Sequence, residues 1–172
     1  MRVYIPATLA MLTQLVADGV MPARSGTAFA VTPTLREAYA HGDEDELGEI
    51  ALQEAALASL RLLAGEGVGE GTGEEAGLPP RRAVLVAEAD DVTVRPDLDD
   101  AVVRLAGPVK LADVIAAYVD NSAAEPAVLA AVAVVDAADL GDEDAELTVG
   151  DAQDHDLAWY AAQELPFLLE LL

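Results

Sequence analysis

The chain has 172 residues, of which 53% are hydrophobic, and its formal net charge at pH 7 is −23. This hydrophobic fraction excludes an intrinsically disordered chain, and the length is typical of one globular domain covering residues 1–172. The excess of negative charge repels phosphate backbones and anionic lipids, so we expect neither nucleic acid nor a membrane as a partner.

The sequence also narrows the chemistry and the cellular location. It contains no cysteine, which removes disulfides, thiolate zinc sites and thiol nucleophiles from consideration. The first residues lack the basic and apolar segments of a secretory signal. The longest uninterrupted apolar run, residues 127–135, has nine residues and is too short to span a bilayer. We therefore expect a soluble, cytoplasmic protein.

Two strand patterns and two short helical patterns begin the chain. The strands are expected at residues 2–5 and 27–32, and the helices at residues 8–19 and 32–42. Each of these helices begins at a threonine, whose hydroxyl can accept a hydrogen bond from a free backbone N–H of the first turn.

One long helix, expected over residues 43–64, is the strongest pattern in the sequence. It opens with four consecutive acidic residues, which suit the positive end of a helix dipole. At 1.5 Å per residue, about 21 residues give a rod of roughly 30 Å. Because many of its apolar positions are alanine, we expect a sheet to lie close against it.

Residues 65–80 interrupt these patterns with alternating glycines, four glutamates and a Pro-Pro pair. A glycine-rich loop before a helix can bind phosphate, but here the P-loop lysine is missing and the glutamates would repel an anion. We interpret the segment as a flexible surface loop and expect no bound cofactor.

The second half of the chain begins with a continuously apolar strand at residues 82–88, which we expect to lie inside the sheet and to pair antiparallel with residues 101–105. Residues 109–119 are ambiguous, because their apolar spacing is helical whereas residues 114–119 are apolar enough for a strand. We prefer a short helix there.

A further helix is expected at residues 126–136 and a short strand at residues 147–149. The whole pattern predicts an α/β or α+β fold, with a single mixed sheet of about four to six strands packed against several helices, one of them long.

Residues 136–156 contain nine carboxylates and neither lysine nor arginine. The acids at residues 139–146 are oxygen ligands of the kind that calcium prefers. The EF-hand spacing is missing, because Gly141 precedes the run of acids and no glutamate occupies the distal position. We interpret this segment as a solvated acidic loop and expect no metal ion.

The carboxyl-terminal segment offers the candidate catalytic residues. A histidine, a tyrosine and several acids beside bulky apolar residues can form an acid–base pair with shifted pKa values. The candidates are Asp154, His155, Asp156, Tyr160 and Glu164, of which His155, Tyr160 and Glu164 have the most suitable chemistry.

A structural interpretation of the same segment is preferred. It predicts a terminal strand and helix that bury Trp159, Phe167 and Leu168 in the core, with His155 exposed among acids. Aromatic residues dominate cores, and a chain end needs such an anchor to be ordered.

Four segments, residues 2–9, 30–40, 58–63 and 155–165, resemble an actinobacterial family of uncharacterised proteins. The resemblance extends over nearly the whole chain except the glycine-rich loop. It implies a bacterial cytoplasmic protein. The family has no assigned activity, so the resemblance assigns no catalytic residues.

Three functions are consistent with the sequence. The first is an interaction module whose acidic surface binds a basic protein, because residues 41–172 carry a net charge of −24 against +1 for residues 1–40. The second is an enzyme or metal-dependent protein with its site in residues 154–164. The third is a small-molecule site near Tyr4 and Thr8. We prefer the first function, and we expect that the protein is not an enzyme.

Overall fold

The computed structural model describes residues 1–23, 26–68 and 77–172. Its strands are β1 (Arg2–Ala7), β2 (Val20–Met21), β3 (Thr27–Phe29), β4 (Ala83–Glu88), β5 (Val92–Val94), β6 (Val102–Leu105), β7 (Val109–Lys110), β8 (Val114–Val119) and β9 (Ala158–Ala161). Its α-helices are α1 (Leu9–Asp18), α2 (Pro33–Ala38), α3 (Glu44–Gly65), α4 (Glu125–Asp139), α5 (Glu143–Gln153) and α6 (Leu165–Glu170).

Seven of the strands form one sheet in the order β5-β6-β3-β1-β4-β8-β9, and β2 pairs with β7 in a separate ribbon. Every pairing among the described strands is antiparallel. The predicted combination of one main sheet, several helices and one long helix is confirmed. The sheet has more strands than the four to six expected, and its antiparallel pairing corresponds to the α+β alternative.

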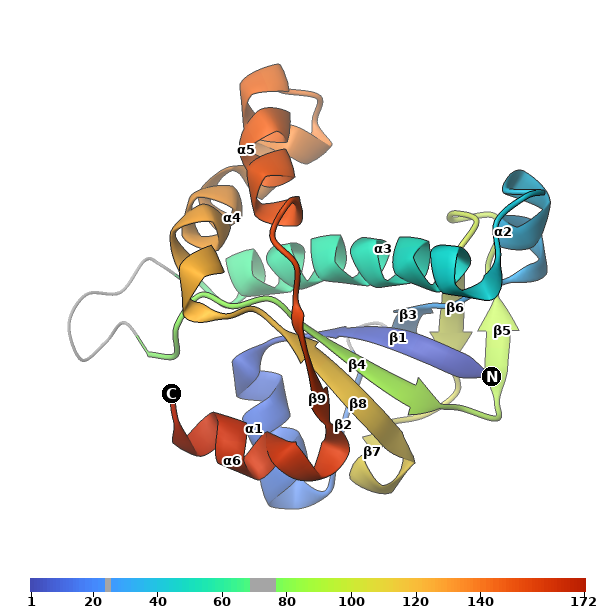
Figure 1. Cartoon of the computed structure of the whole chain (residues 1–172), viewed down its shortest axis with the longest axis horizontal. Helices are drawn as coiled ribbons and strands as arrows, with labels where there is room; N and C mark the ends of the chain where they lie inside the picture. The colour runs from blue at the N-terminus through green and yellow to red at the C-terminus, as the bar shows by residue number, and fades with distance from the viewer. Residues whose placement is uncertain (24–25, 69–76) are drawn as a thin grey trace.

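The two faces of the sheet are covered by different helices (Figure 1). Along β1, Val3 and Ile5 belong to a buried cluster with leucines of α1 and α6. Tyr4, between them, packs in a second cluster with α3. This alternation follows from the two-residue period of a strand, so the sheet is the middle layer of three.

Helix α3 forms as predicted and packs closely on the sheet. The Asp43 side chain caps it by accepting a hydrogen bond of 2.8 Å from the Glu46 backbone N–H. Ala51 and Ala55 are fully buried in its interface with the sheet, and their small side chains permit the close approach. Within the described residues, no helix is long and apolar enough to cross a membrane.

Helices α4 and α5 form a hairpin that packs against the carboxyl-terminal half of α3, on the side of α3 away from the sheet (Figure 1). Their shared core with α3 contains Leu60, Val128, Val135 and Val149. The expected helix at residues 126–136 is confirmed as the larger part of α4.

The prediction of an acidic loop with a strand at residues 147–149 is wrong, because residues 143–153 form α5. The Asp142 side chain caps this helix at 2.9 Å from the Ala145 backbone N–H. The acids of the first turn suit its positive end. Ala145, Val149 and Ala152 follow at helical spacing and are buried.

The predicted helix at residues 109–119 is also wrong. The chain there forms β7, a short 3₁₀ turn and β8. Strand β8 lies between β4 and β9 and pairs with both, so hydrogen bonding to distant segments outweighs its helical apolar spacing.

The partner predicted for residues 82–88 is wrong too. Strand β4 lies inside the sheet, as expected, but it pairs with β1 and β8. Strand β6, which was expected beside it, pairs with β3 and β5.

The carboxyl-terminal segment forms the expected strand and helix, β9 and α6, but Trp159 and Phe167 are not buried in the core as predicted. Trp159 is 58% exposed and Phe167 is 69% exposed. Leu165 and Leu168 are buried against the cluster that includes α1, so aliphatic side chains hold the chain end. Of the predicted flexible loop at residues 65–80, residues 69–76 lie outside the described residues.

A fully buried ion pair joins the ends of β4 and β8. Arg82 donates to both carboxylate oxygens of Asp120, at 2.9 and 2.8 Å, and its backbone N–H donates to the same carboxylate at 2.8 Å. The guanidinium also donates to the Gln153 side chain and to the His155 carbonyl oxygen, each at 2.8 Å. The ends of β4 and β8, the end of helix α5 and the segment that leads from α5 to β9 therefore all contact Arg82.

We predict that Asp120→Asn lowers the free energy of unfolding by about 3–5 kcal/mol, because it leaves the Arg82 charge buried without a counter-charge. Urea unfolding followed by circular dichroism measures the loss. Asp139→Asn is the control, since it breaks an exposed pair with Arg61 worth less than about 1 kcal/mol. Equal losses in the two variants would contradict the central role of Arg82.

Candidate functional site

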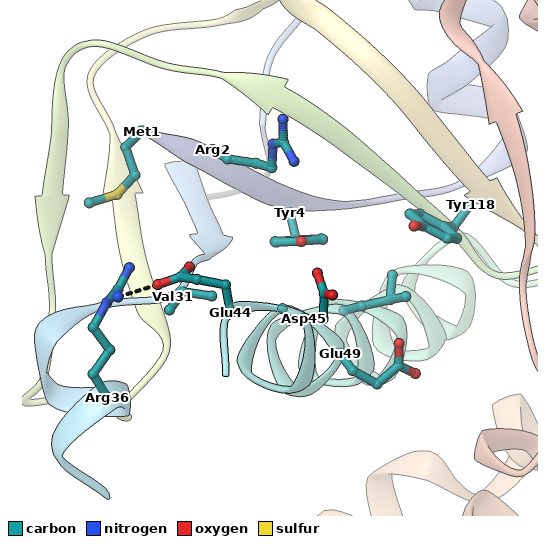
Figure 2. A pocket seen from close by; sticks show the side chains of 11 residues that line it. Met1, Arg2, Tyr4, Val31, Arg36, Glu44, Asp45, Glu49 and Tyr118 are labelled. Carbon is teal, nitrogen blue, oxygen red and sulfur yellow. Dashed lines mark ion pairs between the residues drawn. The ribbon is translucent and has the colours of Figure 1, made fainter. Parts of the chain in front are cut away.

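A cleft of about 660 Å³ opens between the amino-terminal half of α3 and the sheet (Figure 2). Strand β1 supplies Arg2 and Tyr4, β8 supplies Tyr118, and α3 supplies Asp45 and Glu49. The volume is in the range of small-molecule sites. The cleft also has the mixture of polar and aromatic side chains that such sites use for recognition.

The two tyrosines are half-buried on the face of the sheet that α3 covers. Gly48 of α3 lies opposite Tyr4, and a Cβ atom at this position would be 3.0 Å from the Tyr4 hydroxyl oxygen. The missing side chain therefore makes room for the phenol, and a glycine near the amino-terminal end of α3 is explained by this contact rather than by helix propensity.

Most positive groups around the cleft already have acidic partners. Arg36 pairs with Glu44, as the dashed line in Figure 2 shows, and Arg2 lies 3.7 Å from Glu88. Among the ion pairs of the described residues, none involves Asp45 or Glu49.

Glu49 accepts a hydrogen bond of 3.1 Å from the Gln53 side-chain amide. This neutral donor can orient the carboxylate without cancelling its charge. Internal pairing therefore leaves two negative charges on the α3 wall of the cleft, at Asp45 and Glu49.

The surroundings of Tyr4 favour its neutral form. Burial raises the pKa of the Tyr4 phenol, Tyr118 adds to the increase, and Glu49 and Asp45 contribute further, while Arg2 acts in the opposite direction. The hydroxyl therefore keeps its proton at neutral pH and can act as a hydrogen-bond donor toward the cleft.

The candidate residues of the carboxyl-terminal segment do not line this cleft. His155 is half-buried, and its backbone carbonyl accepts a hydrogen bond from Arg82. Tyr160 packs against the buried cluster that includes α1 and α6. Glu164 is exposed, and its carboxylate accepts a hydrogen bond of 3.1 Å from the Ala161 backbone N–H.

Two smaller cavities, of about 400 and 210 Å³, are likewise lined by residues other than His155, Tyr160 and Glu164. Asp154 and Asp156 are exposed on either side of His155. The contacts of these residues are those of packing and of a helix start.

The small-molecule hypothesis named one residue of the cleft, Tyr4, and one outside it. Thr8 is fully buried, accepts a hydrogen bond from the Met11 backbone N–H at 3.2 Å and donates to Glu66 at 2.6 Å. Its hydroxyl therefore caps α1. Asp45 and Glu49 were not predicted as site residues, although their four-residue spacing predicts a shared helix face.

The described residues contain no group of three or more histidine, aspartate or glutamate side chains able to hold a metal ion. Among the acids at residues 139–146, whose oxygens are of the kind that calcium prefers, Asp139 pairs with Arg61 at 2.9 Å and Asp142 caps α5. Both carboxylates thus have structural partners.

A second feature is the acidic hairpin surface, defined as the exposed side chains of residues 136–156 on and beside α4 and α5. All nine carboxylates of this segment are exposed. Only Asp139 forms an ion pair within the described residues. Leu140 and Leu147 lie among them and are 90% and 70% exposed.

We predict that Tyr4 ionises above pH 10, the ordinary value for tyrosine, because burial disfavours the phenolate. Ultraviolet titration of the wild type and of Tyr4→Phe isolates its contribution. The unfolded chain ionises first, so the free energy of unfolding falls as the pH rises from about 10 through the folded-state pKa. The fall should be less steep in Tyr4→Phe. A Tyr4 transition at or below the ordinary value would contradict the described environment.

Comparison with known proteins gives a family and no function. No curated protein and no solved structure matches the chain. The model of DUF6912, a family of unknown function, matches residues 1–169. This match confirms the resemblance to an uncharacterised family that the sequence analysis noted. The chain therefore belongs to the family of unknown function DUF6912.

Proposed function

We propose that this protein is a cytoplasmic interaction module that binds a basic segment of another protein on its acidic hairpin surface. The observation that carries the proposal is the exposure of all nine carboxylates of residues 136–156, a segment that has no lysine or arginine. A cationic partner would be attracted to this surface from a distance and oriented on it.

The fold neutralises little of the negative charge internally. The ion pairs of the described residues use six carboxylates, those of Glu44, Glu88, Asp97, Asp120, Glu125 and Asp139. The whole chain has 32 acidic residues. Most of the charge is therefore available to a partner.

Two exposed leucines indicate the kind of basic segment. Leu147 lies on α5 with Glu143 and Asp144 one turn before it and Asp151 one turn after it. Leu140 lies in the connection between α4 and α5. An amphipathic basic helix would cover both leucines while its lysines and arginines meet the acids around them. Burial of one leucine contributes about 1.5–3 kcal/mol.

We predict that neutralising Glu143, Asp144, Glu146 and Asp151 to the corresponding amides weakens partner binding about tenfold or more, from four charge pairs of about 0.3–1 kcal/mol each. The control neutralises four exposed acids outside the hairpin, Glu37, Asp90, Asp91 and Asp113. Both variants have the same net charge, so only the position of the carboxylates differs.

The partner is captured from the native cytoplasm on immobilised wild-type protein and on both variants, at low and high salt, and identified by mass spectrometry. The expected result is a basic protein that the wild type and the control retain at low salt, and that the hairpin variant loses. Equal capture by all three proteins, or equal loss from both variants, would overturn the proposal.

A Leu140→Ser, Leu147→Ser double variant separates apolar contact from charge. It should weaken binding without changing the dependence of affinity on salt, because it alters no charge. Binding measured by titration calorimetry with the identified partner tests this prediction. An affinity unchanged from that of the wild type would mean that the leucines lie outside the interface.

A further inference from the structure

We infer that the cleft between α3 and the sheet is a binding site for a single cationic group, a guanidinium or a primary ammonium. Asp45 and Glu49 would supply its counter-charge, and the rings of Tyr4 and Tyr118 would supply its aromatic contacts. This site is separate from the acidic hairpin surface and does not depend on the proposed function.

The charges that internal pairing leaves free determine the sign of the ligand. The arginines that line the cleft are Arg2 and Arg36, and both already have carboxylate partners. The amino-terminal ammonium, at the rim, donates to the Ala89 carbonyl oxygen at 2.9 Å and lies 3.5 Å from the Glu88 carboxylate, which it shares with Arg2. These three cations face four carboxylates, those of Glu44, Glu88, Asp45 and Glu49. One net negative charge therefore remains, which repels an anion and attracts a cation.

The geometry suits a flat or compact cation. Figure 2 shows Asp45 and Glu49 on the α3 side and Tyr4 and Tyr118 on the sheet side of the same space. Aromatic rings attract guanidinium and ammonium groups, and this contribution increases where water is excluded. Carboxylates on one wall and tyrosines on the other therefore select a cation by both charge and shape.

Asp45 and Glu49 are exposed, but the cleft that they line is shaped by contacts within the fold. Its volume of about 660 Å³ would hold a small amine or one long side chain. Gly48 keeps the wall of α3 clear in front of the Tyr4 hydroxyl, and the Gln53 amide orients Glu49. The neutral Tyr4 phenol adds a hydrogen-bonding group that does not oppose a cation.

Two sources could provide the cation, namely a free amine metabolite or the arginine or lysine side chain of a protein. Three probes that each carry one positive charge distinguish them: butylguanidine, butylamine and the peptide amide acetyl-Gly-Arg-Gly. Binding to the wild type is measured by titration calorimetry and by shifts of the tyrosine ring resonances in nuclear magnetic resonance spectra. Saturable binding of butylguanidine or butylamine above that of the peptide indicates a free small cation, and the reverse order indicates a protein side chain.

We predict that Glu49→Gln weakens binding of the best probe about tenfold or more. The matched control, Glu146→Gln, also removes one exposed charge from a helix but lies on α5, and should leave the affinity within about twofold. Tyr118→Leu should weaken binding as well, whereas Tyr39→Leu, at an exposed tyrosine outside the cleft, should not. Circular dichroism verifies that each variant is folded.

Two results would overturn the inference. One is the absence of saturable binding of all three probes to the wild type. The other is equal weakening by Glu49→Gln and Glu146→Gln, which would show diffuse attraction by the net charge. The hairpin variant with four neutralised acids should bind the best probe at the cleft, so failure of the hairpin proposal and failure of this one are distinguished.

Discussion

The buried ion pair between Arg82 and Asp120 is the interaction on which the arrangement of the other elements depends. Removing two charges from water is costly, so the pair is stable only when the remaining donors and acceptors are satisfied. Gln153 and the His155 carbonyl oxygen accept two further guanidinium hydrogens. The Gln153 amide in turn donates to the Gln53 carbonyl oxygen of α3. The position of α5, and hence of the acidic hairpin surface, follows from satisfying one buried arginine.

Helix α3 connects the two proposed binding surfaces and is fixed to the sheet at one end. The buried Ser59 hydroxyl donates to the Ala7 carbonyl oxygen at 2.7 Å and accepts from the Ala83 backbone N–H at 3.1 Å. It thereby links the paired ends of β1 and β4. The opposite half of α3 faces the sheet across the cleft, where Gly48 meets Tyr4. One helix thus combines a tightly bonded half with a half that leaves space for a ligand.

The sequence allowed the elements with local causes to be predicted. Helix α3 has its cap, its acidic first turn and its apolar spacing within its own residues, so its bounds were close to correct. Strand β8 has no such local cause, because its stability comes from pairing with β4 and β9. In α5 the buried positions are mostly alanine, and acids between them concealed the helical spacing. The cleft could not be predicted, because it forms where Tyr118 of β8 lies opposite α3. That position depends on the order of the strands in the sheet.

Most arginines that form ion pairs among the described residues join two secondary-structure elements or the segments next to them. Most carboxylates away from these contacts therefore have no ion-pair partner in the described part of the chain. Arg36 joins α2 to α3, Arg61 joins α3 to α4, and Arg2 on β1 faces Glu88 on β4. Each pair reduces repulsion at a contact that the fold requires. The cleft wall and the hairpin surface are not contacts of this kind, so among the described residues their carboxylates other than Asp139 have no ion-pair partner and repel one another. A cationic ligand at either place would relieve that repulsion, and would therefore stabilise the folded protein by an amount that rises with the logarithm of the ligand concentration above its Kd.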